Sequence, residues 1–206
     1  MAIAAYLLGS IPTGYLVGRA KGIDIRKVGS GNIGATNVFR ILGTVPGSVA
    51  LIVDGLKGFA ACAWVADLII SHYSVPVTQQ EYLRILAGVA AVLGHNFTCW
   101  LHFKGGKGVA TGAGVFFALA PLPAGIALVT WTVFLAISRY VSVASIAGAA
   151  ALPAAIWVFP NSLTLRIVAT VIGLLIIVKH QGNIKRLMNG TERQFGRKPG
   201  TPEVSK

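Results

Sequence analysis

The sequence predicts an all-α integral membrane protein: a bundle of seven transmembrane helices with the N-terminus outside and the C-terminus in the cytoplasm. The first observation is composition, because 54% of the 206 residues are apolar, 12% are charged and the mean hydropathy is +0.71. A soluble domain carries roughly twice that share of charged residues. The second observation is a series of seven apolar stretches, and the third is the distribution of lysine and arginine between them.

The apolar stretches lie at about 1–20, 46–72, 82–101, 108–120, 122–138, 141–159 and 163–178. A crossing needs about 20 residues, so the fourth stretch, which ends before Pro121 and Pro123, is expected to be tilted, broken or re-entrant. The first stretch has no basic region before it and contains Pro12, which is not the pattern of a cleaved signal peptide. We expect its regularly spaced glycines to serve helix packing.

The cationic residues indicate the orientation. If the spans alternate and the C-terminal segment is cytoplasmic, 15 of the 18 lysines and arginines fall on the cytoplasmic side. Arg84 and Arg166 fall opposite, and Lys57 lies within the second span. This asymmetry follows the positive-inside rule. Topology and anionic lipid then account for the formal net charge of +12, and no nucleic-acid partner is expected.

No linker, low-complexity run or internal repeat divides the chain, so residues 1–206 are predicted to form a single membrane-embedded domain. A helical bundle with cytoplasmic loops covers 1–188, and a short basic tail covers 189–206. Cys62 and Cys99 lack metal-ligand spacing and are not expected to form a disulfide. The sequence indicates no obligatory protein partner.

The segment 24–40 is too polar to cross a bilayer and is predicted to be a structured cytoplasmic loop. Three of its glycines match the GxGxxG pattern, but no βαβ unit surrounds them, so a dinucleotide site is rejected. What remains is a set of amides and neutral donors beside one cation, which suits a phosphate or a polyol. The groups concerned are Ser30, Gly31, Asn32, Thr36, Asn37 and Arg40.

The glycine-rich segment 103–114 carries Lys104 and Lys107 among five glycines. Glycine lets backbone amides converge on an anion, and Gly105 and Gly106 lie between the two lysines. The apolar run that follows predicts a helix whose N-terminus faces the same anion. The alternative interpretation is a flexible basic loop between membrane helices.

Charged residues also occur within the predicted spans. Asp54 and Lys57 are three residues apart on one face of the second span. Charges at that depth are costly and face an interior cavity. An ion pair that only holds helices together and a role in the site remain alternatives. His95, near the end of the third span, is interpreted as a hydrogen-bonding residue between helices, with contact to a substrate as the alternative.

Two more polar pairs follow. Ser142 and Ser145 open the sixth span, and His180 and Asn183 share a helical face at the end of the seventh. With the two segments above, all four polar clusters map to one side of the membrane. They predict a cytoplasm-facing pocket of cations, amides and hydroxyls over an apolar floor, which suits a phosphorylated polar molecule meeting a fatty chain.

Acids are scarce, with six Asp and Glu in the whole chain. Because Asp54 alone is expected near the pocket, no paired carboxylates are available to hold a divalent ion, and neither a metal nor another cofactor is expected. No histidine is followed five positions later by aspartate, so the dyad of the large glycerolipid acyltransferase family is missing.

Several motifs nevertheless resemble one family over nearly the whole chain. They are GSGNIGATN at 29–37, DGLKG at 54–58, GHNF and FKGGKGVAT between 94 and 111, SVAS at 142–145 and HQGNIKRLMNGTE at 180–192. In this order they resemble the acyl-phosphate:glycerol-3-phosphate acyltransferases, the PlsY family.

The resemblance implies a seven-helix enzyme of the bacterial inner membrane. It would transfer an acyl group from acyl phosphate to the 1-hydroxyl of glycerol 3-phosphate, the first acylation in phospholipid synthesis. It implies catalytic roles for Lys107, Ser145, His180 and Asn183, and substrate-binding roles for Ser30, Gly31, Asn32, Asn37, Arg40, Lys104, Gly105 and Gly106. Gln181 and Gly182 depart from the family's usual Arg-Glu, which leaves Glu192 as the nearest acid.

An activated donor needs mainly alignment with the acceptor hydroxyl and neutralisation of two phosphates. The resemblance suggests that a substrate phosphate assists deprotonation while His180 and Asn183 position the acceptor. The alternative from another class is a transporter for a phosphorylated metabolite. The polar residues gather on one side with no matching set opposite, which disfavours a path through the membrane.

Overall fold

The computed structural model describes residues 1–196, and every regular element within them is helical. The predicted all-α class is therefore confirmed. In chain order the α-helices are α1 (Ala2–Ser10), α2 (Thr13–Ala20), α3 (Ala35–Leu42), α4 (Thr44–Ala60), α5 (Ala66–His72), α6 (Val77–Asn96), α7 (Val109–Leu119), α8 (Pro121–Ser138), α9 (Val141–Val158), α10 (Leu163–Lys179) and α11 (Gln181–Met188). Short 3₁₀ turns cover Ile25–Lys27 and Cys99–Leu101, and a π-helical turn over Ala61–Val65 joins α4 to α5.

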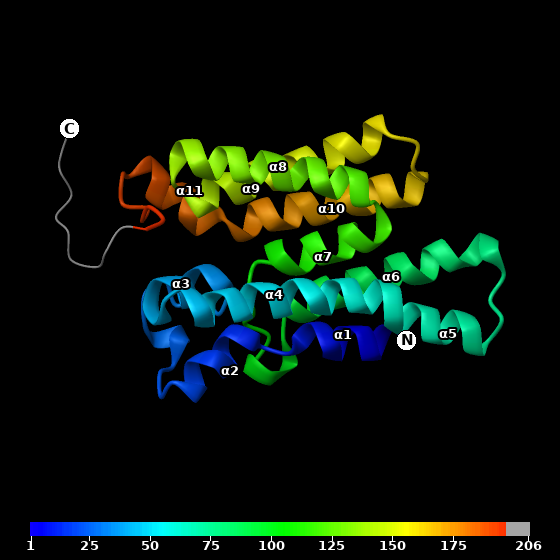
Figure 1. Cartoon of the computed structure of the whole chain (residues 1–206), viewed down its shortest axis with the longest axis horizontal. Helices are drawn as coiled ribbons and strands as arrows, with labels where there is room; N and C mark the ends of the chain where they lie inside the picture. The colour runs from blue at the N-terminus through cyan, green and yellow to red at the C-terminus, as the bar shows by residue number, and fades with distance from the viewer. Residues whose placement is uncertain (197–206) are drawn as a thin grey trace.

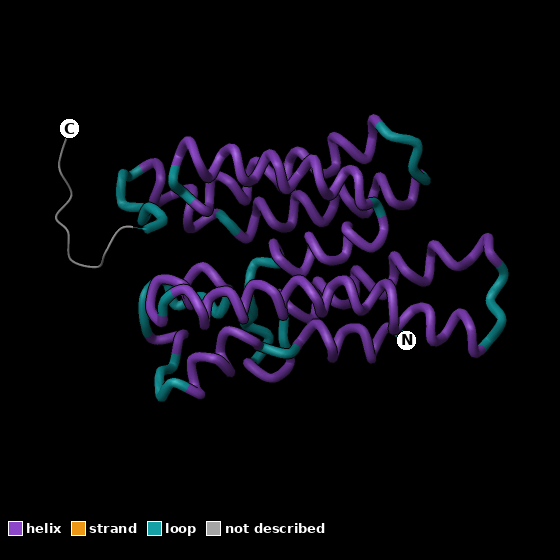
Figure 2. The backbone as a smooth tube through the Cα atoms, in the orientation of Figure 1, coloured by secondary structure: helices purple, strands orange, loops and turns teal. Residues whose placement is uncertain are grey.

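The helices form two groups with α7 between them (Figure 1). In one group α1 packs on α6 and α3 packs on α4, and in the other α9 packs between α8 and α10. Because α7 packs against both α4 and α8, it joins the two groups. Loops lie at both ends of the molecule, and the loop that leads into α7 lies in its interior (Figure 2).

The first predicted span is broken at Ile11 and Pro12. Proline lacks an N–H and restricts the residue before it, so the helix ends and restarts as α2. The break exposes backbone carbonyls inside the protein, and Lys57 Nζ donates to the Ile11 carbonyl at 2.9 Å. A second departure from expectation is α3, which begins within the segment 24–40 that was predicted to be a structured loop and ends at Leu42.

By length and composition, three helical segments can cross a membrane: Thr44–His72, Pro121–Ser138 and Val141–Val158. The bent pair of α10 and α11 is a fourth candidate, so the count of seven is not confirmed. Apolar side chains on α8, such as Leu122, Val129 and Ile137, are exposed, as expected for a surface in lipid. The chain is a multi-pass helical membrane protein.

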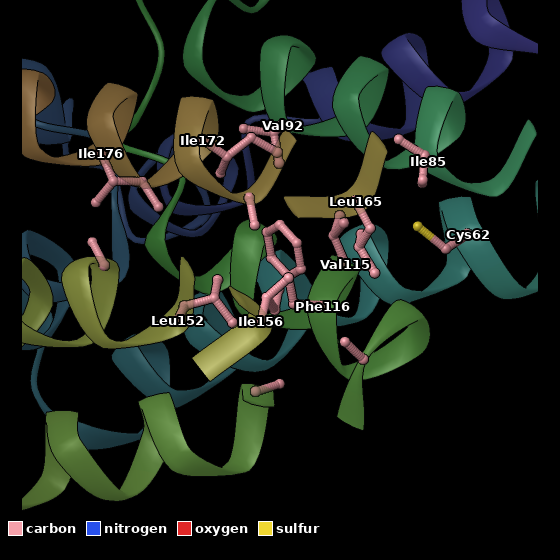
Figure 3. Packing of buried hydrophobic residues seen from close by; sticks show 14 residues of the cluster. Cys62, Ile85, Val92, Val115, Phe116, Leu152, Ile156, Leu165, Ile172 and Ile176 are labelled. Carbon is pink, nitrogen blue, oxygen red and sulfur yellow. The ribbon is translucent and has the colours of Figure 1, made fainter. Parts of the chain in front are cut away.

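The core lies where α7 meets the second group. Phe116 is fully buried at its centre, next to Val115 and opposite Leu152 and Ile156 (Figure 3). Side chains from α6 and α10 complete the cluster. Because α7 carries this core, its position sets the separation of the two groups.

Residues 189–196, the first part of the predicted basic tail, pack against the rest of the protein. Glu192 is 6% exposed, and the Phe195 N–H donates to the Arg139 carbonyl at 2.7 Å. The Phe195 ring also meets the Phe39 ring edge-on, with centroids 6.2 Å apart. This segment therefore joins α3 to the second group of helices. The rest of the predicted tail, 197–206, lies outside the described residues.

Glycines let α7 approach α4 closely. A Cβ at Gly114 would overlap the Gly55 carbonyl oxygen, and a Cβ at Gly58 would overlap the Thr111 carbonyl. Small residues at such contacts allow backbones to touch without a hydrophobic driving force.

We therefore expect Gly114→Ala to destabilise the protein by about 1–3 kcal/mol, the usual cost of overpacking. Gly125→Ala on α8 is the matched control, because its Cβ meets no atom within 4 Å and alanine favours a helix by up to about 1 kcal/mol. Thermal unfolding in detergent measures both. Equal unfolding temperatures for the two variants would contradict close packing of α4 and α7.

Candidate active site

A cavity of about 260 Å³ opens between the two groups of helices. Its polar lining comes from Ser30, Asn32, Thr36, Asn37, Arg40, Asp54, His95, Lys107, Ser142, Ser145, His180, Asn183 and Glu192. Its apolar lining includes Phe116 and Phe117 on α7, Ala124 and Leu128 on α8, and Leu152 on α9. On α7 and α9, the polar lining residues lie at or just before the first turns, and the apolar ones lie two to three turns further along. The cavity is therefore polar at one end and apolar at the other.

Three helices begin at the polar end. Residues around the first turns of α3 (Gly34–Thr36), α7 (Gly108–Ala110) and α9 (Val141 and Ser142) line the cavity. The first amides of a helix have no partner within it, and the helix dipole favours negative charge at this end. Three such ends around one cavity form a site for an anion such as phosphate.

Lys107 heads a hydrogen-bond chain that ends at a carboxylate. Its Nζ donates to Asn183 Oδ1, and Asn183 Nδ2 donates to Glu192 Oε1 at 2.7 Å. Ser142 Oγ donates to the same Glu192 oxygen at 3.0 Å, and Arg186 Nε donates to Oε2 at 2.7 Å. A lysine ammonium has three N–H donors. Asn183 fixes the position of the Lys107 ammonium through one of them, and the others remain available to a ligand.

The charged groups of this hydrogen-bond chain shift one another's pKa values. Burial lowers the pKa of Lys107 to about 8, with Arg186 and Arg40 acting in the same direction and Glu192 opposing them. Burial would raise the pKa of Glu192, but hydrogen bonds from Asn183, Arg186 and Ser142 outweigh burial and hold that pKa below its ordinary value. Glu192 therefore stays ionised and favours the charged form of Lys107.

His180 and Ser145 present free groups to the cavity. The Nδ1 of His180 lies 2.8 Å from the Ile176 carbonyl, which can only accept, so Nδ1 carries the proton of the neutral ring. Nε2 is then an acceptor for a ligand hydroxyl. The Ser145 Oγ accepts from Trp131 Nε1 at 3.3 Å, which leaves the Ser145 hydroxyl proton available to a ligand.

Arg40 reaches the cavity from α3. Its Nη2 donates to the Arg193 carbonyl at 3.0 Å, which orients the side chain. Its Nε is buried and has no hydrogen-bond partner in the described part of the chain. A buried donor without a partner is costly, and a bound anion would satisfy it.

Some predicted binding residues have other partners. The Gly105 and Gly106 amides donate to the carbonyls of Asn96 and His95 at 3.2 and 2.9 Å, because the end of α6 leaves these carbonyls unpaired. The Gly31 amide donates to the Val28 carbonyl at 3.0 Å. These three glycines do not line the cavity, and neither does Lys104, which is exposed. Their geometry does not support the predicted role in phosphate binding.

Asn37 lines the cavity as predicted, and its side chain also contacts the preceding loop. Its amide group donates to the Ile25 and Val28 carbonyls at 3.0 and 3.1 Å, and its Oδ1 accepts from the Ser30 N–H at 2.9 Å. Asn37 therefore holds the preceding loop, and it is the Ser30 hydroxyl that remains for a ligand. Asn32 Oδ1 similarly accepts from the Gly34 N–H at 2.8 Å, just before α3.

Sequence reasoning missed the central position of Glu192 and the contact of Trp131 with Ser145. Glu192 had been noted only as the nearest acid, and no motif spacing indicates that it is buried. A signal for Glu192 existed in the polarity of the segment after α11, since an acid among cations is a natural counter-ion.

The cavity joins an anion-binding end to an apolar wall within a multi-pass helical membrane protein. This arrangement defines a class of membrane proteins that bind a phosphate-bearing head group beside an apolar chain. Residues 1–190 match the family model described as glycerol-3-phosphate acyltransferase, and the chain belongs to this family. The resemblance seen in the motifs is thereby confirmed.

Relatives agree with the family model over nearly the whole chain. A glycerol-3-phosphate acyltransferase of Geotalea daltonii is 47% identical and covers 95% of this chain and 96% of its own. One from Synechococcus elongatus is 42% identical and covers 98% of this chain and 96% of its own. The crystal structure of PlsY, an integral membrane glycerol 3-phosphate acyltransferase, in its glycerol 3-phosphate form is 40% identical, with a TM-score of 0.84 over 95% of this chain and 94% of that one.

The pKa of Lys107 yields a test with an anion of constant charge. Sulfate should bind the purified protein well below pH 8 and roughly tenfold or more weakly at pH 9.5, because Lys107 then loses its proton. In Lys107→Arg the guanidinium stays charged, so affinity should persist at high pH. Calorimetric titration in detergent measures both. The same pH profile in the two proteins would assign the titration to another group.

Proposed function

We propose that this chain transfers an acyl group from an acyl phosphate to the 1-hydroxyl of sn-glycerol 3-phosphate, giving lysophosphatidic acid and inorganic phosphate. This is the first acylation of phospholipid synthesis. The observation that carries the proposal is the single cavity that joins the Lys107–Asn183–Glu192 chain to an apolar wall. One end suits the phosphates of both substrates, and the other suits a fatty chain.

The chemistry requires little covalent work from the protein. The acceptor oxygen attacks the carbonyl carbon of the acyl phosphate, a new carbon–oxygen bond forms, and the bond between the carbonyl carbon and the phosphate oxygen breaks. The departing phosphate takes the electron pair, and the hydroxyl proton passes to a substrate phosphate oxygen. The protein aligns the reactants and neutralises the developing charge.

The catalytic roles follow from the contacts of each group. Lys107 and Arg40, with the amides at the helix starts, stabilise the phosphates. His180 Nε2 accepts from the acceptor hydroxyl and orients it, while Asn183 holds Lys107 in place. Ser145 donates its free hydroxyl proton to a substrate oxygen. No group of three His, Cys, Asp or Glu side chains gathers within residues 1–196, and a reaction without metal stays a prediction.

Purified protein with palmitoyl phosphate and glycerol 3-phosphate, assayed in EDTA, should release phosphate and lysophosphatidic acid. Lys107→Ala should lose at least about tenfold in rate, the scale of one charge-assisted contact. Lys104→Ala is the matched control and should stay active, because Lys104 is exposed and does not line the cavity. Equal loss in both variants would contradict the assignment of the lysines.

The donor is tested separately by replacing palmitoyl phosphate with a palmitoyl thioester. Comparable turnover with the thioester would overturn acyl phosphate as the donor while leaving the acceptor assignment in place. Loss of activity in EDTA that Mg²⁺ restores would overturn the metal-free reaction.

We further propose seven crossings in the bacterial inner membrane, with the N-terminus outside and the polar end of the cavity facing the cytoplasm. The asymmetry of lysine and arginine supports this orientation. The broken pair α1–α2, α6 and the short α7 would supply the crossings beyond those that length and composition indicate.

Cysteine labelling tests the orientation in a background that lacks Cys62 and Cys99. Thr78→Cys at the start of α6 should react with an impermeant maleimide added to intact cells, provided that this end faces outward. Asn189→Cys after α11 should react only after the cells are permeabilised. Both residues are exposed, so access depends on the side of the membrane. The reverse pattern would place the cavity on the outer side.

A further inference from the structure

Asp54 is one of two acids that line the cavity within the described residues. The other, Glu192, has hydrogen bonds to both of its oxygens. Asp54 differs, because Thr13 Oγ1 donates to its Oδ1 at 3.0 Å and Lys57 Nζ forms an ion pair with the same oxygen at 2.8 Å. No group within residues 1–196 donates to its Oδ2. Asp54 therefore has one engaged oxygen and one free oxygen.

The free oxygen is held in a fixed orientation. The side chains of Asp54 and Lys57 are both 3% exposed, and Lys57 Nζ also donates to the Ile11 carbonyl at 2.9 Å. His95 Nδ1 lies 3.7 Å from the same Oδ1. The contacts of the carboxylate within the described residues all involve Oδ1, and Asp54 lines the cavity, so Oδ2 is the oxygen left without a partner there. The lysine also cancels the charge that would otherwise repel a phosphate.

Asp54 and the first turn of α7 line the same cavity. The residue that follows Asp54, Gly55, would place a Cβ 3.7 Å from the Ala110 carbonyl oxygen in the first turn of that helix. The amides of this turn form part of the anion site. A ligand whose phosphate occupies the site would bring its adjacent atoms toward Asp54. A carboxylate oxygen cannot serve a phosphate there, but it is a strong acceptor for a hydroxyl.

We propose that Asp54 Oδ2 accepts a hydrogen bond from the 2-hydroxyl of glycerol 3-phosphate and makes the enzyme specific for a polyol phosphate. This inference rests on the proposed function. The 1-hydroxyl must face the acyl donor and His180, which lies between α10 and α11 in the second group of helices, whereas α4 belongs to the first (Figure 1). The 2-hydroxyl is then the group left for Asp54.

The test compares glycerol 3-phosphate with 1,3-propanediol monophosphate, which lacks the 2-hydroxyl but keeps the reacting one. A site built to bind a hydroxyl rejects an analogue that lacks it. The wild type should therefore prefer glycerol 3-phosphate in kcat/KM by at least about tenfold, the scale of a hydrogen bond to a charged group. KM for palmitoyl phosphate should be the same with either acceptor.

Asp54→Asn should abolish this preference. Thr13 and Lys57 still donate to the inner atom, so the amide places its oxygen there and turns its NH₂ toward the cavity, which changes an acceptor into a donor. Asp67→Asn is the matched control, since it makes the same substitution in an ion pair with Arg84 that does not line the cavity. It should keep the full preference.

The double variant Asp54→Ala/Lys57→Met controls for misfolding. It removes both members of the buried ion pair, so neither charge is left without its partner. It should lose the preference as Asp54→Asn does. A wild type that acylates neither acceptor would overturn the proposed function itself. A wild type that acylates both equally, or active Asp54 variants that keep the full preference, would overturn only the role of Asp54.

Discussion

The buried carboxylate of Glu192 is the contact on which the polar end of the cavity depends. It accepts from Ser142 on α9 and from Asn183 and Arg186 on α11, and through Asn183 it sets the position of Lys107. A buried charge without partners would cost several kcal/mol, so these donors must converge for the fold to be stable. Glu192 therefore balances the positive charges of Lys107 and Arg186 and also holds both side chains in place.

A second constraint is the close approach of α4 and α7. Gly55, Gly58 and Gly114 let these backbones touch, and Phe116 then fills the space between the two groups of helices. The first turn of α7 and Asp54 on α4 both line the cavity. Packing in the apolar region thus determines which polar groups meet at the cavity, because side chains at the start of α7 cannot move independently of its core.

The cavity concentrates positive potential at moderate cost. Three helix starts supply partial charges without burying full ones, and the two lining acids lie against Lys57 and Arg186. An anion that enters the cavity exchanges its water molecules for hydrogen-bond donors of the protein. These donors are already in position, so no free energy is spent on ordering them. This arrangement supports the proposed binding of doubly charged phosphates at the polar end of the cavity.

The sequence by itself determined the helical membrane class, because apolar composition leaves no soluble alternative, and it identified Lys107, Arg40, Ser145, His180 and Asn183, which all line the cavity. Only the tertiary structure decided which donors are free. Gly105 and Gly106 match a phosphate-binding loop in sequence, but their amides donate to carbonyls at the end of α6. Glu192 lies in the predicted tail, but it accepts a hydrogen bond from Ser142, 50 residues away in the chain. Residue type reveals what a group can bind, whereas its partner depends on contacts between distant segments, which motif spacing does not record.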